Sequence, residues 1–200
     1  MTDYILLFLG AFFAAAISGA AGFGGALLLL PLLTHTVGVT EAVPLLTVAQ
    51  LVGNLSRAAF GFGQIHWRPV LIFLASAIPF AVLGAFSFVS LPKPLVVRLV
   101  GAAILAFVLI RALGLVAFKP TNRLLLGGGA SVGLLSGLVG SAGPLGAAIF
   151  LTLNLPPVAY IASEATTAIG MHAVKSVVYG SELRLSASFW PIFKDGRSNP

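Results

Sequence analysis

The sequence has little charge for its length. Only 8% of its 200 residues are charged, 58% are hydrophobic, and the mean hydropathy is +1.08. An ordinary soluble domain has about 25% charged residues, and so few charges cannot make the surface of a water-soluble protein of this size polar. The composition therefore excludes a soluble globular fold and predicts a protein whose solvent is largely lipid.

Cysteine is absent, and histidine occurs only three times, at widely separated positions. These absences exclude disulfides, thiolate zinc sites, iron–sulfur clusters and cysteine nucleophiles, so we expect neither a metal nor another cofactor. The net charge of +6 comes from 11 Lys and Arg residues scattered singly through apolar sequence. Scattered cations are typical of the flanks of membrane spans, and we expect no nucleic-acid partner.

Six long apolar segments are separated by short polar connections. A membrane span needs about 20 mostly apolar residues to cross a hydrocarbon core of roughly 30 Å. Asp3 is the only charged side chain ahead of the first segment, which lacks the basic n-region of a signal peptide, so we expect this segment to be retained. The predicted spans cover residues 4–33, 42–62, 69–91, 95–117, 124–155 and 158–180.

The first and fifth segments are longer than one span requires, because about 30 residues of continuous helix measure about 45 Å. Each has a glycine cluster in its middle. The clusters contain Ser18, Gly19, Gly22, Gly24 and Gly25 in the first segment and Ser136, Gly137, Gly140, Ser141 and Gly143 in the fifth. Glycine lowers helix stability, and Pro144 removes a backbone hydrogen bond. We predict a glycine-broken or re-entrant helix in both segments; close helix packing through small residues is the alternative.

The two clusters align without a gap at a constant offset of 118 residues. The same offset also matches polar positions in the following spans. The matched pairs are Ser18 and Ser136, Gly22 and Gly140, Gly25 and Gly143, Asn54 and His172, and Arg57 and Lys175. Glycine-interrupted segments at corresponding places in two halves indicate the binding site of a secondary transporter.

We therefore predict an all-α polytopic transmembrane helix bundle with two internal repeats, residues 1–118 and 119–200. The spans at 69–91 and 95–117 would recur near residues 187–235, so the second repeat is expected to be incomplete. A homo-oligomer is one way to complete such a fold. Inverted repeats are favoured over parallel ones by a weak bias of Lys and Arg to one side of the membrane.

Polar residues form a stripe along the second span. Thr47, Gln50, Asn54 and Arg57 are spaced three, four and three residues apart, so on a helix they lie within about an 80° arc. Ionisable groups within a span are costly in lipid and mark functional sites. A row of hydrogen-bond donors ending in a cation suits an oxyanion that has lost its water. Snorkelling of Arg57 to the headgroups and interhelical hydrogen bonding are the alternatives.

The last span carries a related set. His172 and Lys175 are three residues apart, and Thr166 and Thr167 lie nearby. In addition, a helix that restarts after a break presents unpaired N–H groups and the positive end of its dipole, where anions bind. The predicted substrate-binding residues are Ser18, Gly22, Gly24, Gly25, Thr47, Gln50, Asn54, Arg57, Ser136, Gly140, Ser141, Gly143, Thr166, Thr167, His172 and Lys175.

In these motifs the sequence resembles the TauE/SafE family of membrane transporters. The resemblance is carried by Ser-Gly-x-x-Gly-Phe-Gly-Gly at residues 18–25, by the polar second span with Gln50 and Asn54, and by Ser-Gly-x-x-Gly at residues 136–140. It covers nearly the whole chain. It implies a transporter of sulfite, organosulfonates and related sulfur-containing anions in the bacterial cytoplasmic membrane, and not an enzyme. The expected partners are membrane lipid and a small anionic substrate.

Two other functions compete with this prediction. An incomplete second repeat also fits a channel-like protein or a membrane assembly subunit that does not itself transport. An intramembrane serine hydrolase is a remote alternative, which would need Ser136 within hydrogen-bond reach of His172.

Overall fold

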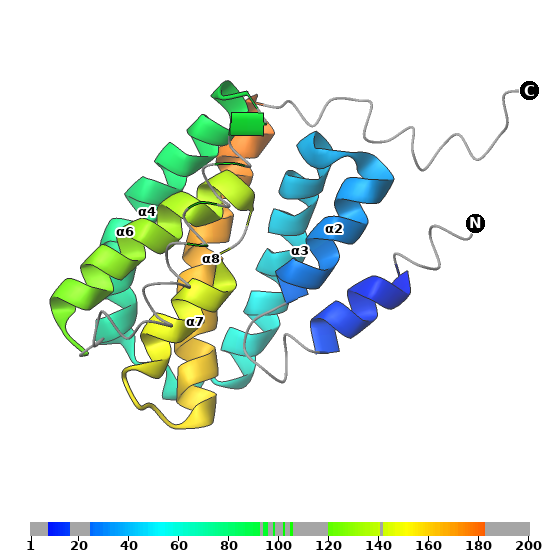
Figure 1. Ribbon diagram of the computed structural model, residues 1–200. Helices are drawn as coiled ribbons and strands as arrows, with labels where there is room; N and C mark the ends of the chain where they lie inside the picture. The colour runs from blue at the N-terminus through cyan, green and yellow to red at the C-terminus, as the bar shows by residue number, and fades with distance from the viewer. Residues whose placement is uncertain are drawn as a thin grey trace, which may run out of the picture.

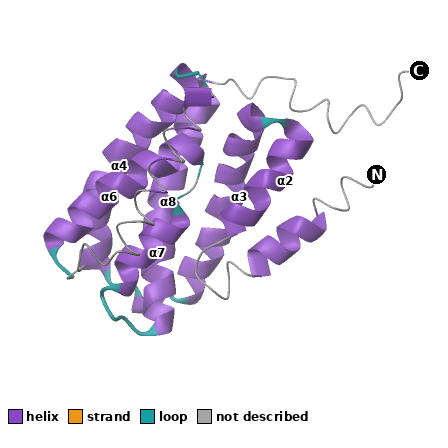
Figure 2. Ribbon diagram, viewed as in Figure 1, coloured by secondary structure: helices purple, strands orange, loops and turns teal. Residues whose placement is uncertain are grey.

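The computed structural model describes residues 8–16, 25–92, 94–95, 98, 102, 105, 120–140 and 142–182. Figure 2 shows helices joined by short loops, with no strand among these residues. Residues 8–16 form a first helix. The other elements are α2 (Gly25–Val37), α3 (Val39–Phe60), the 3-10 turn η1 (Phe62–Gln64), α4 (Trp67–Ser90), α6 (Asn122–Val139), α7 (Gly143–Leu151) and α8 (Pro157–Glu182). The prediction of an all-α fold is confirmed.

The helix boundaries follow the predicted spans closely. The predicted spans 42–62, 69–91 and 158–180 correspond to α3, α4 and α8 within a few residues. The predicted span 95–117 lies almost entirely outside the described residues. Thr121 caps the start of α6, because its hydroxyl oxygen accepts a hydrogen bond of 3.1 Å from the Leu124 N–H.

The fifth predicted span is broken inside its glycine cluster, as predicted. Helix α6 ends at Val139, and Gly140 follows with φ 87°, a left-handed conformation that glycine adopts without strain. Helix α7 then begins at Gly143, with Pro144 in its first turn, where proline's missing N–H has no helical partner to lose. In Figure 1, α7 turns back toward the end of the bundle at which α6 begins. Most of the first glycine cluster lies outside the described residues.

Helices α4 and α6 approach each other very closely along a row of glycines in α6. Gly129, Gly133 and Gly137 occur at every fourth position and so share one face of the helix. A methyl group on any of them would overlap backbone carbonyl oxygens of α4. Small residues at this spacing allow the backbones of membrane helices to pack in direct contact. The glycines of this segment therefore serve both close helix packing and the helix break.

Helix α8 lies at the centre of the described bundle, where it packs against α3, α4, α6 and α7 (Figure 1). It runs antiparallel to α3. Near one end of the pair Gly61 lies against Val158 and Ala162, and Arg57, one turn earlier on α3, faces Glu164 further along α8. This crossing brings Arg57 on α3 and Glu164 on α8 to a common interface.

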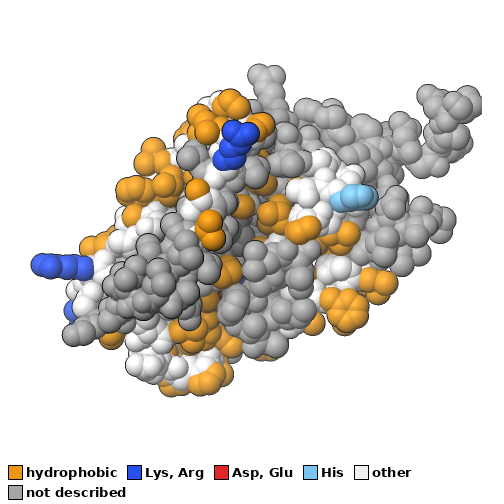
Figure 3. All heavy atoms as spheres, in the orientation of Figure 1, with side chains coloured by type: hydrophobic (Ala, Val, Ile, Leu, Met, Phe, Trp, Pro, Cys, Tyr) orange, Lys and Arg blue, Asp and Glu red, His pale blue; other side chains and the backbone are white. Residues whose placement is uncertain are grey.

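The outer surface is rich in apolar side chains. Phe60 is 94% exposed, and Phe8 and Val177 are each 71% exposed. On the face shown in Figure 3, hydrophobic side chains cover much of the described surface, and the few Lys and Arg side chains lie toward its ends. Such a surface suits contact with lipid. Among the described helices, α4 alone is long and apolar enough to pass as a membrane span by length and composition.

Candidate functional site

A cavity of about 830 Å³ lies between the helix of residues 8–16, α3 and α8. Its wall is mainly apolar and includes Ala14, Leu29 and Ile161, whereas Gln50 and Arg57 are polar. A pocket with an apolar wall and a few polar groups is the usual form of a small-molecule site. The residues that line it are Ala11, Ala14, Ala15, Leu29, Ala49, Gln50, Val52, Gly53, Ser56, Arg57, Phe60, Gly61, Val158 and Ile161.

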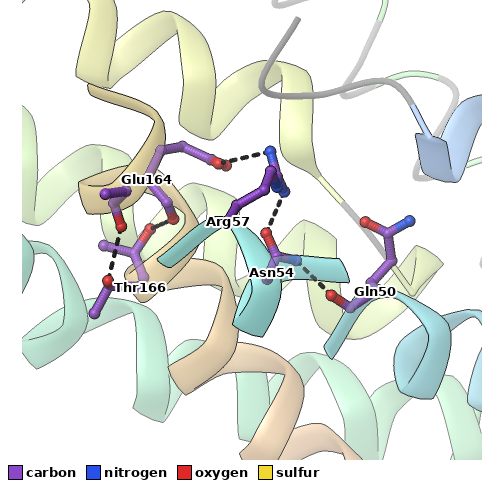
Figure 4. Close-up of polar contacts among 7 residues, drawn as sticks. Gln50, Asn54, Arg57, Glu164 and Thr166 are labelled. Carbon is purple, nitrogen blue, oxygen red and sulfur yellow. Dashed lines mark hydrogen bonds and ion pairs between the residues drawn. The ribbon is translucent and has the colours of Figure 1, made fainter. Parts of the chain in front are cut away.

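Arg57 is held at the wall of this cavity by partners from two helices (Figure 4). Its Nη2 donates to Oδ1 of Asn54, three residues earlier on α3. Its Nη1 lies 3.6 Å from Oε2 of Glu164 on α8, and the two side chains are only 12% and 5% exposed. The guanidinium is therefore fixed in place at the cavity rather than extended along the helix toward a membrane surface.

Asn54 is oriented by the backbone of its own helix. Its Nδ2 donates a hydrogen bond of 2.7 Å to the main-chain carbonyl of Gln50, which leaves Oδ1 directed at Arg57. The Gln50 side chain points away from Asn54 in Figure 4, and it also lines the cavity. Gln50, Asn54 and Arg57 thus form one connected group, on the helix face that their spacing predicts.

Glu164 is not one of the predicted substrate-binding residues, although its spacing places it on the same helical arc as His172 and Lys175, where it could partner Lys175, lie near the interface or relay a proton. It is the one acidic residue between positions 158 and 180. Its side chain is buried, and Oε2 has no hydrogen-bond partner among the described residues. The neighbouring threonines do not supply one, because Thr166 donates to the carbonyl of Ala162 and Thr167 to the main-chain carbonyl of Glu164, both at 2.7 Å. Because the threonine hydroxyls are used elsewhere, the carboxylate of Glu164 is paired with Arg57.

A second polar cluster forms where α8 meets the end of α6. Lys175 is fully buried, and its Nζ donates to the carbonyl of Ser136 at 3.0 Å, to Ser136 Oγ at 2.7 Å and to the carbonyl of Gly140 at 2.8 Å. Three acceptors match the three donors of an ammonium group. The last carbonyls of a helix lack internal partners and carry the negative end of its dipole, so Lys175 caps α6 at its break.

Tyr179 reinforces this cap from one turn further along α8. Its hydroxyl donates a hydrogen bond of 2.5 Å to the carbonyl of Gly137. His172 is also buried, and its Nδ1 has no hydrogen-bond partner in the described part of the chain. Thr47, on α3, is fully buried and donates to the carbonyl of Val43 at 2.9 Å. Its hydroxyl is therefore used within its own helix.

The structure thus divides the predicted site residues between two places. Gln50, Asn54 and Arg57 meet at the cavity, and Ser136, Gly140 and Lys175 meet at the helix break. Glu164 and Lys175, one in each cluster, are 11 positions apart on α8, which corresponds to about 16 Å along its axis. Substrate binding by these residues stays a prediction.

The remaining predicted residues lie around the glycine clusters. Gly25 lies in α2, and Gly143 is the first residue of α7. Four predicted residues lie outside the part of the chain that the structure describes: Ser18, Gly22, Gly24 and Ser141. No group of three or more His, Asp or Glu side chains in the described segments is arranged to hold a metal ion.

Comparison with known proteins identifies one family. Residues 7–193 match the family model described as "Sulfite exporter TauE/SafE". No curated protein and no solved structure matches the chain. The match covers nearly the whole sequence and includes both glycine clusters and both polar stripes.

Proposed function

Because the chain belongs to the sulfite exporter TauE/SafE family, a family of membrane transporters, we propose that it moves a small sulfur oxyanion or organosulfonate across the bacterial cytoplasmic membrane. Arg57 binds the anion in the cavity between α3 and α8. The observation that carries this proposal is an arginine, its side chain only 12% exposed, held by Asn54 at the wall of a mainly apolar cavity. The transport cycle is an alternation of access to this site.

The chemistry of the site suits an oxyanion. The planar guanidinium presents several N–H donors in a fixed fork, which matches the oxygens of a sulfite or sulfonate group. An anion that loses its water needs replacement donors, and Gln50 and Ser56 line the same cavity. The apolar wall lowers the local dielectric constant, which strengthens the attraction between the anion and Arg57.

The arrangement of the helices supports a pair of inverted repeats, as in several transporter folds. Helices α3 and α8 begin at Val39 and Pro157, so these two starts are 118 residues apart. Helices α3 and α8 nevertheless run in opposite directions (Figure 1). Equivalent helices that point in opposite directions are what an inverted duplication produces.

The same relation connects Arg57 and Lys175. At the offset of 118 residues, Arg57 corresponds to Lys175, and Glu164 corresponds to Leu46. Leu46 lies against Gly140, the glycine whose carbonyl accepts from Lys175. The two repeats therefore place a cation at corresponding points but give it different partners: a carboxylate for Arg57 and a helix end for Lys175. We infer that only the Arg57 side is used for the substrate.

Replacing Arg57 with glutamine is expected to lower the rate of radiolabelled sulfite uptake into proteoliposomes at least tenfold. A hydrogen bond to a charged group contributes about 1.5–3 kcal/mol, and tenfold corresponds to about 1.4 kcal/mol. Arg123→Gln is the matched control, because Arg123 is exposed at the start of α6 and does not line the cavity. Competition by thiosulfate, sulfate, a small sulfonate and chloride ranks the substrates.

The double variant Arg57→Gln with Glu164→Gln guards against a folding defect, because it removes both charges of the pair. Equal uptake by wild type and the folded Arg57→Gln variant would contradict the proposal. Accelerated uptake of labelled sulfite into vesicles preloaded with unlabelled sulfite, that is counterflow, is expected of a carrier; its absence together with unsaturable flux would indicate a channel.

A further inference from the structure

We propose that the carboxylate of Glu164 and the transported anion compete for Arg57, so that each bound anion is accompanied by one proton bound to Glu164. The inference rests on the function proposed above and assigns the coupling of that site. In the empty state Glu164 acts as an internal anion that occupies Arg57. The substrate replaces it, and the displaced carboxylate takes a proton from water.

The geometry places the two charges so that they can be exchanged. Arg57 lines the cavity, whereas Glu164, close to its Nη1, is buried and does not line the cavity. Nη1 of Arg57 lies 3.6 Å from Oε2 of Glu164, and Oε2 has no hydrogen bond from the described residues. An anion entering through the cavity therefore reaches Arg57 without first passing Glu164.

The described surroundings offer Glu164 no second cation. Helix α7 has no titratable residue, and the titratable residues of α4 and α6, Arg68 and Arg123, are exposed. On α8 itself, Lys175 is bound to the end of α6, and His172 lies two turns beyond Glu164. His66, just after η1, is exposed, and its backbone N–H donates to Ser163 at 2.9 Å.

One neutral titratable group lies close by. Tyr160 is one turn before Glu164 on the same face of α8, and its buried hydroxyl has no hydrogen-bond partner among the described residues. A phenol can donate a hydrogen bond to a carboxyl group, but it supplies no positive charge. Arg57 is thus the cation on which the ionised state of Glu164 depends.

Arg57 exchanges the Glu164 carboxylate for the substrate anion because an unpaired buried charge is costly. A buried carboxylate that loses its cation costs several kcal/mol, and a substrate anion at Arg57 adds repulsion. Proton uptake by Glu164 removes both penalties, because the proton comes from the aqueous phase, binds a carboxylate oxygen and leaves one negative charge facing Arg57. A monovalent anion and its proton then cross together without net charge.

Proton uptake on anion binding can be counted by calorimetry. The probe is methanesulfonate, whose own charge does not change near neutral pH, titrated into the purified full chain in buffers of different ionisation enthalpy. We expect one proton taken up per anion in the wild type and in Tyr160→Phe, and none in Glu164→Gln. Wild-type affinity should weaken tenfold per pH unit where the empty site is ionised, whereas the affinity of Glu164→Gln should not change with pH.

The outcomes separate this inference from the proposed function. Anion binding without proton uptake in the wild type, or the same uptake in Glu164→Gln, would overturn the competition while leaving Arg57 as the anion site. Loss of the proton in Tyr160→Phe would move the titrating group to Tyr160 and would also overturn it. If neither the wild type nor Glu164→Gln binds any of the sulfur oxyanions, the proposed function itself fails.

Discussion

Replacing Gly133 with valine is expected to prevent α4 and α6 from packing together and to destroy the folded protein. A side chain at this position would overlap the backbone carbonyl of Ala77. A backbone atom cannot move aside as a flexible side chain can, so the two helices would have to separate. Overpacking a core costs about 1–3 kcal/mol and at times more, and we expect the upper end of this range or beyond because the clash is with the backbone.

The measurement is the size-exclusion profile and the thermal unfolding midpoint of the variant in detergent. Gly127→Val is the matched control, because Gly127 lies on the same helix with no atom within 4 Å of the added carbon. The control should match the wild type, whereas Gly133→Val should aggregate or unfold at a much lower temperature. A Gly133→Val variant with a wild-type midpoint would show that α4 and α6 do not approach as described.

Replacing Lys175 with methionine is expected to destabilise the protein by about 3 kcal/mol or more. Methionine keeps much of the length of the side chain but leaves three buried acceptors, on Ser136 and Gly140, without a donor. Each buried acceptor that loses its partner costs about 1–3 kcal/mol. The end of α6 should therefore loosen at the break that separates it from α7. The unfolding midpoint in detergent or urea measures this loss.

Two further variants calibrate the result. Val177→Met places the same side chain on the exposed face of α8 and should leave the midpoint unchanged, whereas Tyr179→Phe removes one hydrogen bond, to Gly137, and should cost about 1 kcal/mol. A Lys175→Met protein with the wild-type midpoint but no anion binding would contradict the capping role. It would instead support direct contact between Lys175 and the substrate.

The local pattern of the sequence was sufficient for much of the fold. Apolar run lengths placed α3, α4 and α8 within a few residues, because a helix in lipid must satisfy its own backbone. The glycine cluster before Pro144 predicted the break at Gly140, because glycine and proline each weaken the helix at their own positions in the sequence. The alternative of close packing also holds for this segment, since the glycines at 129, 133 and 137 face α4.

The site was harder to predict, because its partners come from distant positions. The stripe of Gln50, Asn54 and Arg57 follows from spacing on one helix, but the pairing of Arg57 with Glu164 joins residues more than 100 positions apart. Nothing in the spacing of α8 says that Glu164 faces α3 or that Lys175 faces the end of α6. Those contacts depend on how the helices cross, which composition and periodicity do not fix.

The role of Arg57 as the anion site is tested by the equilibrium binding of sulfite to the purified protein and to its Arg57→Gln variant, measured by calorimetry. We expect saturable binding to the wild type, weakened at least tenfold by Arg57→Gln, which is about 1.4 kcal/mol, and unchanged in Arg123→Gln. Equal sulfite affinity of the wild type and a folded Arg57→Gln variant would contradict this role, because the anion would then bind at a place other than the cavity between α3 and α8.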